Sequence, residues 1–229
     1  MIIKVCGMRD GGNISEAIKA GADWIGMIFW PKSPRYVQMV PSLTGTLPDS
    51  ANENNVPQEG NAAGGAKKAK RVGVFVNDSA QNIITRVVNF KLDIVQLHGD
   101  ESPTFIRNVR TTLAGGICPD IKFIKAVSVE NANDFDKCAE YEGVVDHFLF
   151  DTKCDGRGGS GKHFDWSLLE NYHGSTPFLL SGGIGVDDAD TLKSLNLPMM
   201  AGIDINSRFE TEPGVKDIDK VKTFINKLR

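Results

Sequence analysis

Two side chains capable of acid–base chemistry follow short apolar runs. Cys6 comes after "IIKV", directly before Gly7, and Asp151 closes the run "HFLFD". A thiolate can remove a proton from carbon and a carboxylic acid can donate one, so the two residues could act as base and acid. Lys4 shares the strand parity of Cys6 and could supply the positive charge that a thiolate needs. The alternative is structural: a core cysteine and a carboxylate that caps a turn.

Other apolar runs are followed by residues suited to binding. Arg35 in "WPKSPRY" follows a proline, and its guanidinium could bind a substrate carboxylate through two hydrogen bonds. Gln96 and His98 in "VQLHGDE" could hydrogen-bond a substrate. A surface arginine and a histidine bonded to a backbone carbonyl are the structural alternatives.

Two glycine-containing or polar stretches near the end of the chain predict a phosphate site. "LLSGGIG" precedes a segment with helical spacing, and glycines let backbone amides approach an anion at a helix N-terminus. "GIDINSR" could complete the cradle with side chains and amides. A plain tight turn is the alternative. The predicted substrate-binding residues in these stretches are Ser181, Gly182, Gly183, Asp204, Asn206 and Ser207.

These residues need a scaffold that gathers the ends of several strands. Short runs rich in β-branched residues alternate with helical patterns, which indicates parallel strands joined by crossovers. Eight such units in 229 residues, with polar groups where the runs end, favour an α/β fold of the (β/α)8 TIM-barrel class over a doubly wound sheet. The predicted strands are Ile2–Cys6, Trp24–Phe29, Val72–Val76, Ile94–Leu97, Ile121–Val127, His147–Asp151, Phe178–Ser181 and Met200–Asp204.

Helix signals support the crossovers. Gly21 is placed to end a helix, and Ser102-Pro103 reads as an N-cap followed by proline at the first helical position. Apolar stripes predict the buried faces of four helices. They consist of Ile14, Ala17 and Ile18; of Ile84, Val87 and Val88; of Phe105, Ile106, Val109 and Leu113; and of Ile218, Val221, Phe224, Ile225 and Leu228.

We expect one barrel domain over residues 1–229 with two irregular segments. Residues 41–70, in the second crossover, are rich in Gly, Asn, Pro and Ala and predict a flexible or irregular insertion. Residues 155–166, "DGRGGSGKHFDW", lack the P-loop spacing because His163 follows Lys162. They could form a glycine-rich flap that closes over a ligand, or a solvated loop.

Composition excludes several classes of function. A net charge of −3 gives no reason to expect a nucleic-acid partner. No apolar stretch approaches the roughly 20 residues that span a bilayer, and no signal-peptide pattern precedes the first strand. The four cysteines lack zinc or disulfide spacing and the histidines lack ligand spacing, which predicts a cytoplasmic protein with reduced thiols and no metal.

The chain resembles the phosphoribosylanthranilate isomerases of tryptophan biosynthesis. The matching strings cover most of the sequence outside about residues 41–70, and the pair "VQLHG" and "GGSGKHFDW" is hard to place in another family. They are "KVCGM", "GADWIGMIFWPKSPRYV", "RVGVFVN", "VQLHGDE", "IKAVSV", "LFDTK", "GGSGKHFDW", "LLSGGI" and "GIDINSRFETEPGVKD".

The resemblance implies a (β/α)8 barrel that performs an Amadori rearrangement of a phosphorylated small molecule without a cofactor. It implies that Cys6 is the general base, that Asp151 is the general acid and that Arg35 faces the anthranilate carboxylate. Phosphate would lie on Gly182, Gly183 and the loop after the eighth strand. This loop reads "DINSRFE", where many members carry "DVSSGVE".

Rival functions remain open at this stage. Indole-glycerol-phosphate synthases need a catalytic lysine with paired glutamates, and pentose-phosphate epimerases need paired Asp and His metal ligands; neither set is evident. A barrel that binds a phosphorylated ligand without catalysis would need the glycine turn but not both Cys6 and Asp151. The sequence leaves monomer and homodimer as equal alternatives.

Overall fold

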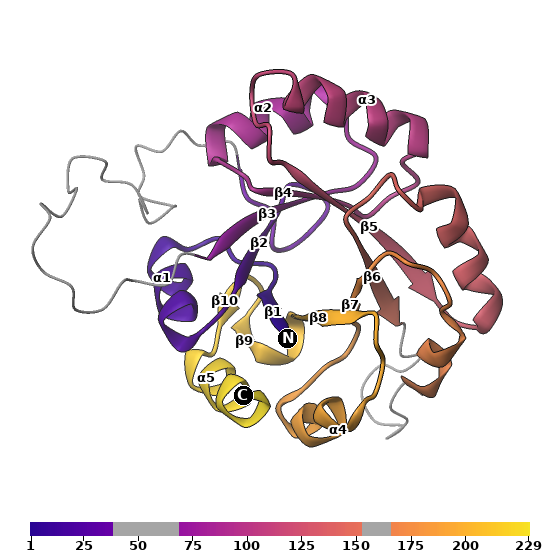
Figure 1. Cartoon of the computed structure of the whole chain (residues 1–229). Helices are drawn as coiled ribbons and strands as arrows, with labels where there is room; N and C mark the ends of the chain where they lie inside the picture. The colour runs from indigo at the N-terminus through magenta and orange to yellow at the C-terminus, as the bar shows by residue number, and fades with distance from the viewer. Residues whose placement is uncertain (39–68, 153–165) are drawn as a thin grey trace, which may run out of the picture.

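The computed structural model describes residues 1–38, 69–152 and 166–229. Eight parallel strands form a closed barrel in sequence order, and β8 returns to pair with β1 (Figure 1). This confirms the predicted (β/α)8 barrel. The strands are β1 (Ile2–Val5), β2 (Trp24–Ile28), β3 (Lys70–Phe75), β4 (Ile94–Leu97), β5 (Lys122–Val129), β6 (His147–Thr152), β7 (Phe178–Ser181) and β8 (Met200–Ile205).

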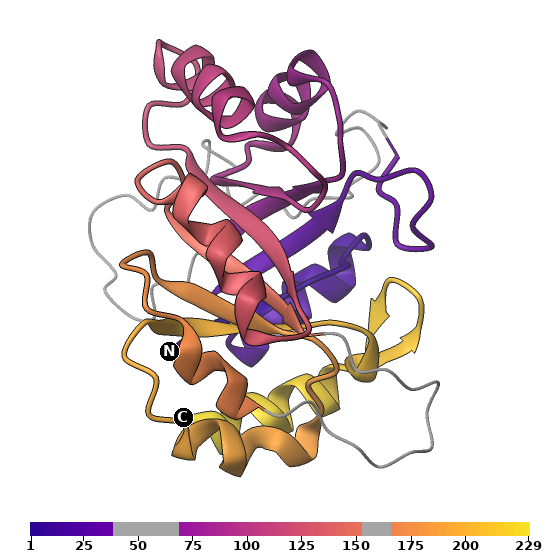
Figure 2. The ribbon, with the colours of Figure 1, turned by 90° about the vertical axis from the view of Figure 1, so that its right-hand side faces the viewer.

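Helical segments surround the barrel, and a short hairpin follows β8 (Figures 1 and 2). The α-helices are α1 (Gly11–Ala20), α2 (Ala80–Phe90), α3 (Pro103–Ala114), α4 (Ala189–Ser194) and α5 (Ile218–Leu228). The 3-10 segments are η2 (Ala132–Tyr141), η3 (Trp166–Asn171), η4 (Val186–Asp188) and η5 (Ser207–Phe209), and the hairpin strands are β9 (Glu210–Glu212) and β10 (Val215–Lys216).

The predicted irregular segments fall largely outside the described residues. Residues 41–68 of the predicted insertion and residues 155–165 of the predicted flap are not described. Lys70, the last residue of the predicted range, pairs with Trp24 as the first residue of β3. Trp166 begins η3.

Side chains cap the helices where the sequence predicts. The Ser102 hydroxyl accepts a hydrogen bond from the Phe105 amide at the start of α3, and Pro103 occupies the first turn. Gly21 ends α1 with φ of 113°, a left-handed conformation that a residue without Cβ adopts at little cost.

The α2 stripe differs from the prediction. Its buried face holds Ile83, Arg86, Val87 and Phe90, whereas Val88 is 53% exposed. The Arg86 guanidinium stacks 4.8 Å from the ring centroid of Phe29, which lets a charged residue occupy the buried face. A pattern read from apolar residues alone misses such a position.

Alternation along the strands divides the core into two compartments. Trp24, Val72, Ile94, Ile124 and Leu149 belong to one buried cluster inside the barrel, and a larger cluster packs between the strands and the helices. Every second residue of a strand points into the barrel. The next inward positions at the carboxyl ends of β1, β4, β6 and β8 are Cys6, His98, Asp151 and Asn206. The strand pleat therefore aims the candidate residues at a common centre.

Candidate active site

A cavity of about 200 Å³ opens at the carboxyl ends of the strands. It unites every predicted site residue except Arg35. Its lining comprises Cys6, Ile28, Val74, Gln96, His98, Asp151, Ser181, Gly182, Gly183, Ile184, Asp204, Asn206, Ser207 and Arg208. The thiol that follows β1 and the carboxyl group on β6 thus face one cavity.

Cys6 lies above a buried ion pair. The Lys4 Nζ donates to Asp204 Oδ1 at 2.9 Å, and the two side chains are 0% and 6% exposed. Burial disfavours the ammonium form, but the attraction of Asp204 and Cys6 outweighs burial and raises the pKa of Lys4. Asp204 therefore contributes to the floor of the cavity as the partner of Lys4.

The Cys6 thiol is not a ready-made thiolate. Burial and the nearby Asp204 carboxylate raise the pKa of Cys6, and the opposing attraction of Lys4 and Lys216 does not cancel this effect. Lys4 does supply the positive neighbour expected from the sequence, but Asp204 shares its charge. Burial and the Asp204 carboxylate thus favour the protonated thiol.

Two glycines make room for this side of the cavity. A Cβ added to Gly26 on β2 would lie 2.8 Å from Sγ and 3.1 Å from Cα of Cys6. A Cβ added to Gly7, which has φ of 74°, would lie 2.5 Å from Cδ of Arg35 and 2.7 Å from Oδ1 of Asn206. The thiol and the arginine thus pack against backbone that carries no side chain.

Asp151 faces His98 across the carboxyl ends of β6 and β4. The His98 Nε2 lies 3.5 Å from Asp151 Oδ2, and the two side chains are 35% and 31% exposed. The Nδ1 of His98 lies 3.0 Å from Nε2 of Gln96. Within the described residues Oε1 of Gln96 is buried without a hydrogen-bond partner, which makes it a candidate acceptor for a ligand hydroxyl.

The glycine turn after β7 has the conformation expected of a ligand cradle. Gly182 and Gly183 have φ of 105° and 62°, and both line the cavity. The helix that follows begins as the 3-10 segment η4, and the Gly185 amide already donates to Asp188 Oδ2 at 2.7 Å. The Gly185 amide at the start of η4 is therefore already engaged, which leaves the turn itself as the part of the prediction that could hold an anion.

Arg208 is a site residue that the sequence interpretation did not select. It is exposed, lines the cavity, and packs within 3.3 Å of a Cβ position at Gly185. Its guanidinium brings a positive charge to the glycine turn. The signal was visible, because "DINSRFE" places a positively charged residue two positions after Asn206 in the predicted phosphate loop.

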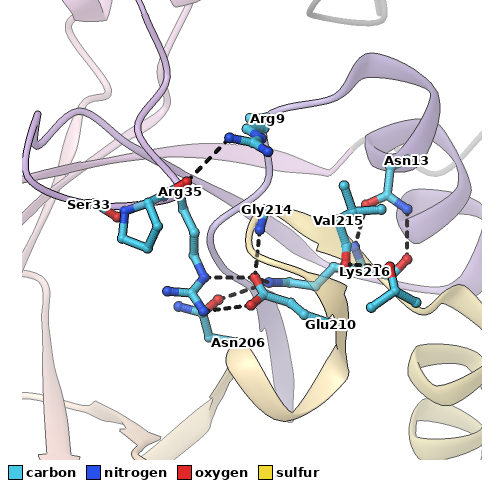
Figure 3. A network of polar contacts seen from close by, with 11 residues as sticks. Arg9, Asn13, Ser33, Arg35, Asn206, Glu210, Gly214, Val215 and Lys216 are labelled. Carbon is cyan, nitrogen blue, oxygen red and sulfur yellow. Dashed lines mark hydrogen bonds and ion pairs between the residues drawn. The ribbon is translucent and has the colours of Figure 1, made fainter.

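Arg35 lies beside the cavity and pairs with a carboxylate of the protein. Its Nε and Nη2 donate to Oε1 and Oε2 of Glu210 at 2.7 and 2.6 Å (Figure 3). The sequence did not predict Glu210 as a site residue, nor its second partner Lys216, although both stand in the string "SRFETEPGVKD". The pairing of Arg35 with Glu210, across 175 residues, could not be predicted from spacing.

A second cavity of about 520 Å³ adjoins the first and shares His98. Glu101, buried beside it, accepts hydrogen bonds from the amides of Asn77 and Gly99 and from Lys125 on β5. These contacts tie the loops after β3 and β4 to β5. They hold the backbone next to His98 in place.

The described part of the chain offers no candidate metal site and no candidate membrane-spanning helix. No group of three or more His, Cys, Asp or Glu side chains there could hold a metal ion. Over the same ranges, no helix is long and apolar enough to cross a bilayer. Cys6, Cys118 and Cys138 are free thiols, and Cys154 lies outside these ranges.

Fold and site together define the class of protein. A closed (β/α)8 barrel with acid–base side chains and a glycine turn at its carboxyl end is an enzyme architecture suited to phosphorylated small molecules. The family profile described as N-(5'phosphoribosyl)anthranilate (PRA) isomerase matches residues 3–227. The chain belongs to this family.

Individual relatives agree with the profile. The N-(5'-phosphoribosyl)anthranilate isomerase of Parabacteroides distasonis is 45% identical over 228 residues, covering 100% of this chain and 93% of that protein. The one from Phocaeicola vulgatus is 43% identical over 229 residues, covering 100% of this chain and 98% of that protein.

Solved structures match over the whole chain. Phosphoribosyl anthranilate isomerase from Thermotoga maritima aligns with a TM-score of 0.74 and 30% identity, covering 100% of this chain and 98% of that one. A phosphoribosyl anthranilate isomerase in complex with reduced 1-(o-carboxyphenylamino)-1-deoxyribulose 5-phosphate aligns with a TM-score of 0.72 and 27% identity, at the same coverage.

Proposed function

We propose that this protein converts N-(5-phosphoribosyl)anthranilate into 1-(2-carboxyphenylamino)-1-deoxyribulose 5-phosphate, an Amadori rearrangement in tryptophan biosynthesis. The observation that carries the proposal is one cavity lined by Cys6, by Asp151 and by the Gly182–Gly183 turn. A thiol and a carboxyl group at different strand ends supply two proton-transfer groups. The turn supplies a place for phosphate.

The chemistry needs one acid and one base. Asp151 in its acid form donates a proton to the furanose oxygen, the bond from this oxygen to C1 breaks, and the nitrogen lone pair forms a Schiff base. Cys6 as thiolate then removes the proton from C2, which gives an enolamine. Tautomerisation to the ketose completes the isomerisation, and no electrons or atoms are gained or lost.

The raised pKa of Cys6 fits this order of steps. Ring opening places a positive iminium nitrogen in the cavity, and a nearby positive charge favours the thiolate. In the free protein the thiolate fraction increases with pH up to that raised pKa. We therefore expect the rate at which iodoacetamide alkylates Cys6 in the free protein to rise with pH from neutrality towards about 9, which a pH profile of the modification, followed at Cys6 by mass spectrometry, checks.

The groups in and beside the cavity suit the phosphate, the sugar and the carboxylate of this substrate. The amides of Gly182 and Gly183 and the side chains of Asn206 and Ser207 are assigned to the phosphate, with Arg208 as an added positive charge. Gln96 and His98 are assigned to the sugar hydroxyls. Arg35, beside Gly7 and Asn206, is assigned to the anthranilate carboxylate.

The direct test follows the loss of anthranilate-adduct fluorescence when purified protein is added. We expect turnover without added metal or cofactor, and the same reaction after treatment with EDTA. Tight binding of the reduced product analogue without turnover would reject the isomerase in favour of a non-catalytic binding barrel. Loss of activity on EDTA treatment would reject the metal-free acid–base scheme.

A further inference from the structure

The contact between Arg35 and Glu210 uses one edge of the guanidinium and leaves another open. Glu210 accepts from Nε and Nη2, which is the side-on geometry. A guanidinium has five donors in a plane, so the edge formed by Nη1 and Nη2 can receive a second carboxylate end-on. In the part of the chain that the structure describes, Nη1 donates no hydrogen bond, and Figure 3 shows it turned away from Glu210.

Glu210 is itself held by several donors. Lys216 Nζ donates to Oε1 at 2.6 Å and the Gly214 amide donates to the same oxygen at 3.1 Å. The Glu210 and Lys216 side chains are 5% and 0% exposed. Hydrogen bonds from Lys216 and Gly214 therefore hold in place the carboxylate that binds Arg35.

The hairpin that carries these residues is fastened to the barrel. The Asn13 side chain on α1 donates to the Lys216 carbonyl at 2.9 Å and accepts from the Lys216 amide at 2.8 Å (Figure 3). Lys216 Nζ also donates to Oδ1 of the cavity residue Asn206 at 2.8 Å. A continuous set of contacts thus runs from α1 through β10 to Arg35.

Two cations, Arg35 and Lys216, surround the single carboxylate of Glu210, and this leaves a positive charge on the group. Arg35 with Glu210 alone would be neutral and would offer little attraction to a substrate carboxylate. Adding Lys216 gives the three residues a net charge of +1 if all are ionised. The arrangement fixes the direction of Arg35 and still leaves one positive charge for a ligand.

We propose that Glu210, braced by Lys216, is a positioning residue that holds Arg35 side-on so that its free edge receives the substrate's aromatic carboxylate. This inference rests on the proposed function, because it assigns Glu210 to the recognition of the anthranilate group. It makes Glu210 a determinant of specificity without contact to substrate. A competing carboxylate, one that must leave before substrate binds, would have the opposite effect on affinity.

The test compares two ligands and a charge-matched variant. The ligands are reduced 1-(o-carboxyphenylamino)-1-deoxyribulose 5-phosphate and the same compound made from aniline, which lacks the carboxylate. The double variant E210Q/K216M removes one negative and one positive charge, so the net charge near Arg35 is unchanged. It also leaves no unpaired buried lysine, which protects folding in a way that E210Q alone does not.

Relative to wild type, we expect E210Q/K216M to lose about 10-fold more affinity for the carboxylated ligand than for the aniline ligand, by titration calorimetry. The loss for the aniline ligand measures the Lys216–Asn206 hydrogen bond, which both ligands share through their phosphate. The control Glu212→Gln, an exposed residue on the same strand, should change neither affinity. If the double variant loses the same affinity for both ligands, Glu210 has only a structural role. If it binds the carboxylated ligand more tightly than wild type does, Glu210 competes with the substrate carboxylate for Arg35. Either result overturns the proposal.

Wild-type turnover, measured in the same preparation, separates this inference from the proposed function. If wild type discriminates between the ligands as expected but does not isomerise the substrate, the function fails and the positioning role stands. If wild type turns over substrate and the double variant shows no ligand-dependent loss, the function stands and the positioning role fails.

Discussion

The two sides of the active-site cavity differ in how firmly their charged groups are held. On the hairpin side, Arg35 makes two hydrogen bonds of 2.7 and 2.6 Å to a carboxylate that is 5% exposed. On the opposite side, His98 and Asp151 stand 3.5 Å apart and each is about a third exposed. The Arg35 guanidinium is thus fixed before substrate arrives, whereas Asp151, the proposed proton donor, keeps access to solvent and to a ligand.

Removing either proton-transfer group should have the largest effect. We expect Asp151→Asn and Cys6→Ala each to lower kcat by about 10²- to 10⁴-fold with KM changed only a few-fold, because general acid–base catalysis contributes on that scale. The fluorescence assay measures both parameters. Cys118→Ala, which changes a thiol on the outer side of the barrel wall, is the matched control.

The contrast between the two sides would be wrong if these variants did not lower kcat while leaving KM nearly unchanged. Turnover of Cys6→Ala within a few-fold of wild type would remove Cys6 as the base. A rise in KM for Asp151→Asn with unchanged kcat would move Asp151 from catalysis to binding.

The space beside Cys6 gives the next largest effect. Gly26→Ala would place a methyl group 2.8 Å from Sγ and 3.1 Å from the backbone Cα of Cys6, and backbone cannot yield cheaply. We expect kcat to fall by about 10- to 100-fold and the free energy of unfolding to fall by about 1–3 kcal/mol. Gly12→Ala in α1, where the new methyl group meets only an Asp10 side-chain oxygen at 3.3 Å, should keep full activity. Wild-type activity in Gly26→Ala would show that Cys6 tolerates displacement.

The firmness of the hairpin side can be measured through pH. Burial opposes ionisation of Glu210, but the hydrogen bonds from Arg35 and Lys216 outweigh it and lower its pKa from 4.5 to about 2. Because the folded-state pKa lies below the unfolded value, its stabilisation is complete above about pH 5 and is lost as pH falls towards 2. We expect wild type to exceed Glu210→Gln in unfolding free energy by about 2–3 kcal/mol more at pH 6 than at pH 2.5.

Urea unfolding at several pH values provides this difference. Groups that titrate identically in both proteins cancel, and Glu212→Gln should give a flat difference over the same range. A pH-independent gap between wild type and Glu210→Gln would mean that the ion pairs are weaker than their geometry indicates.

The smallest expected effect concerns Arg208 at the glycine turn. Arg208→Ala should raise KM about 10-fold with kcat nearly unchanged, because an exposed guanidinium adds binding energy for phosphate on both ground and transition states. The effect should shrink in high salt. An unchanged KM at low salt would leave the phosphate to the backbone amides and to Asn206 and Ser207.

Local patterns were enough to predict the barrel. Turn residues such as Gly21 and Ser102-Pro103 fix helix ends through short-range hydrogen bonds, and both ends were confirmed. The prediction of the buried face of α2 was wrong at Arg86. This residue stacks its guanidinium on an aromatic ring, and a pattern of apolar residues does not mark such a position.

The site was predictable to the extent that strand ends must meet. Cys6, Asp151 and Asn206 come together because strand parity and barrel closure leave them no other direction. The Arg35–Glu210–Lys216 contacts were not predictable, since they join loops 175 residues apart through side-chain geometry. The raised pKa of Cys6 could not be predicted for a related reason. Lys4 is visible in the sequence, but the ion pair that it forms with Asp204 is not.

Barrel closure has a consequence for protein synthesis. Cys6 emerges from the ribosome early, but its amide bonds to Ile205 and its floor partner Lys4 pairs with Asp204. The brace behind Arg35 is completed only at Lys216. A nascent chain therefore carries this thiol without the pocket around it until Lys216 has been translated, and any truncation before residue 216 yields a protein without a finished pocket.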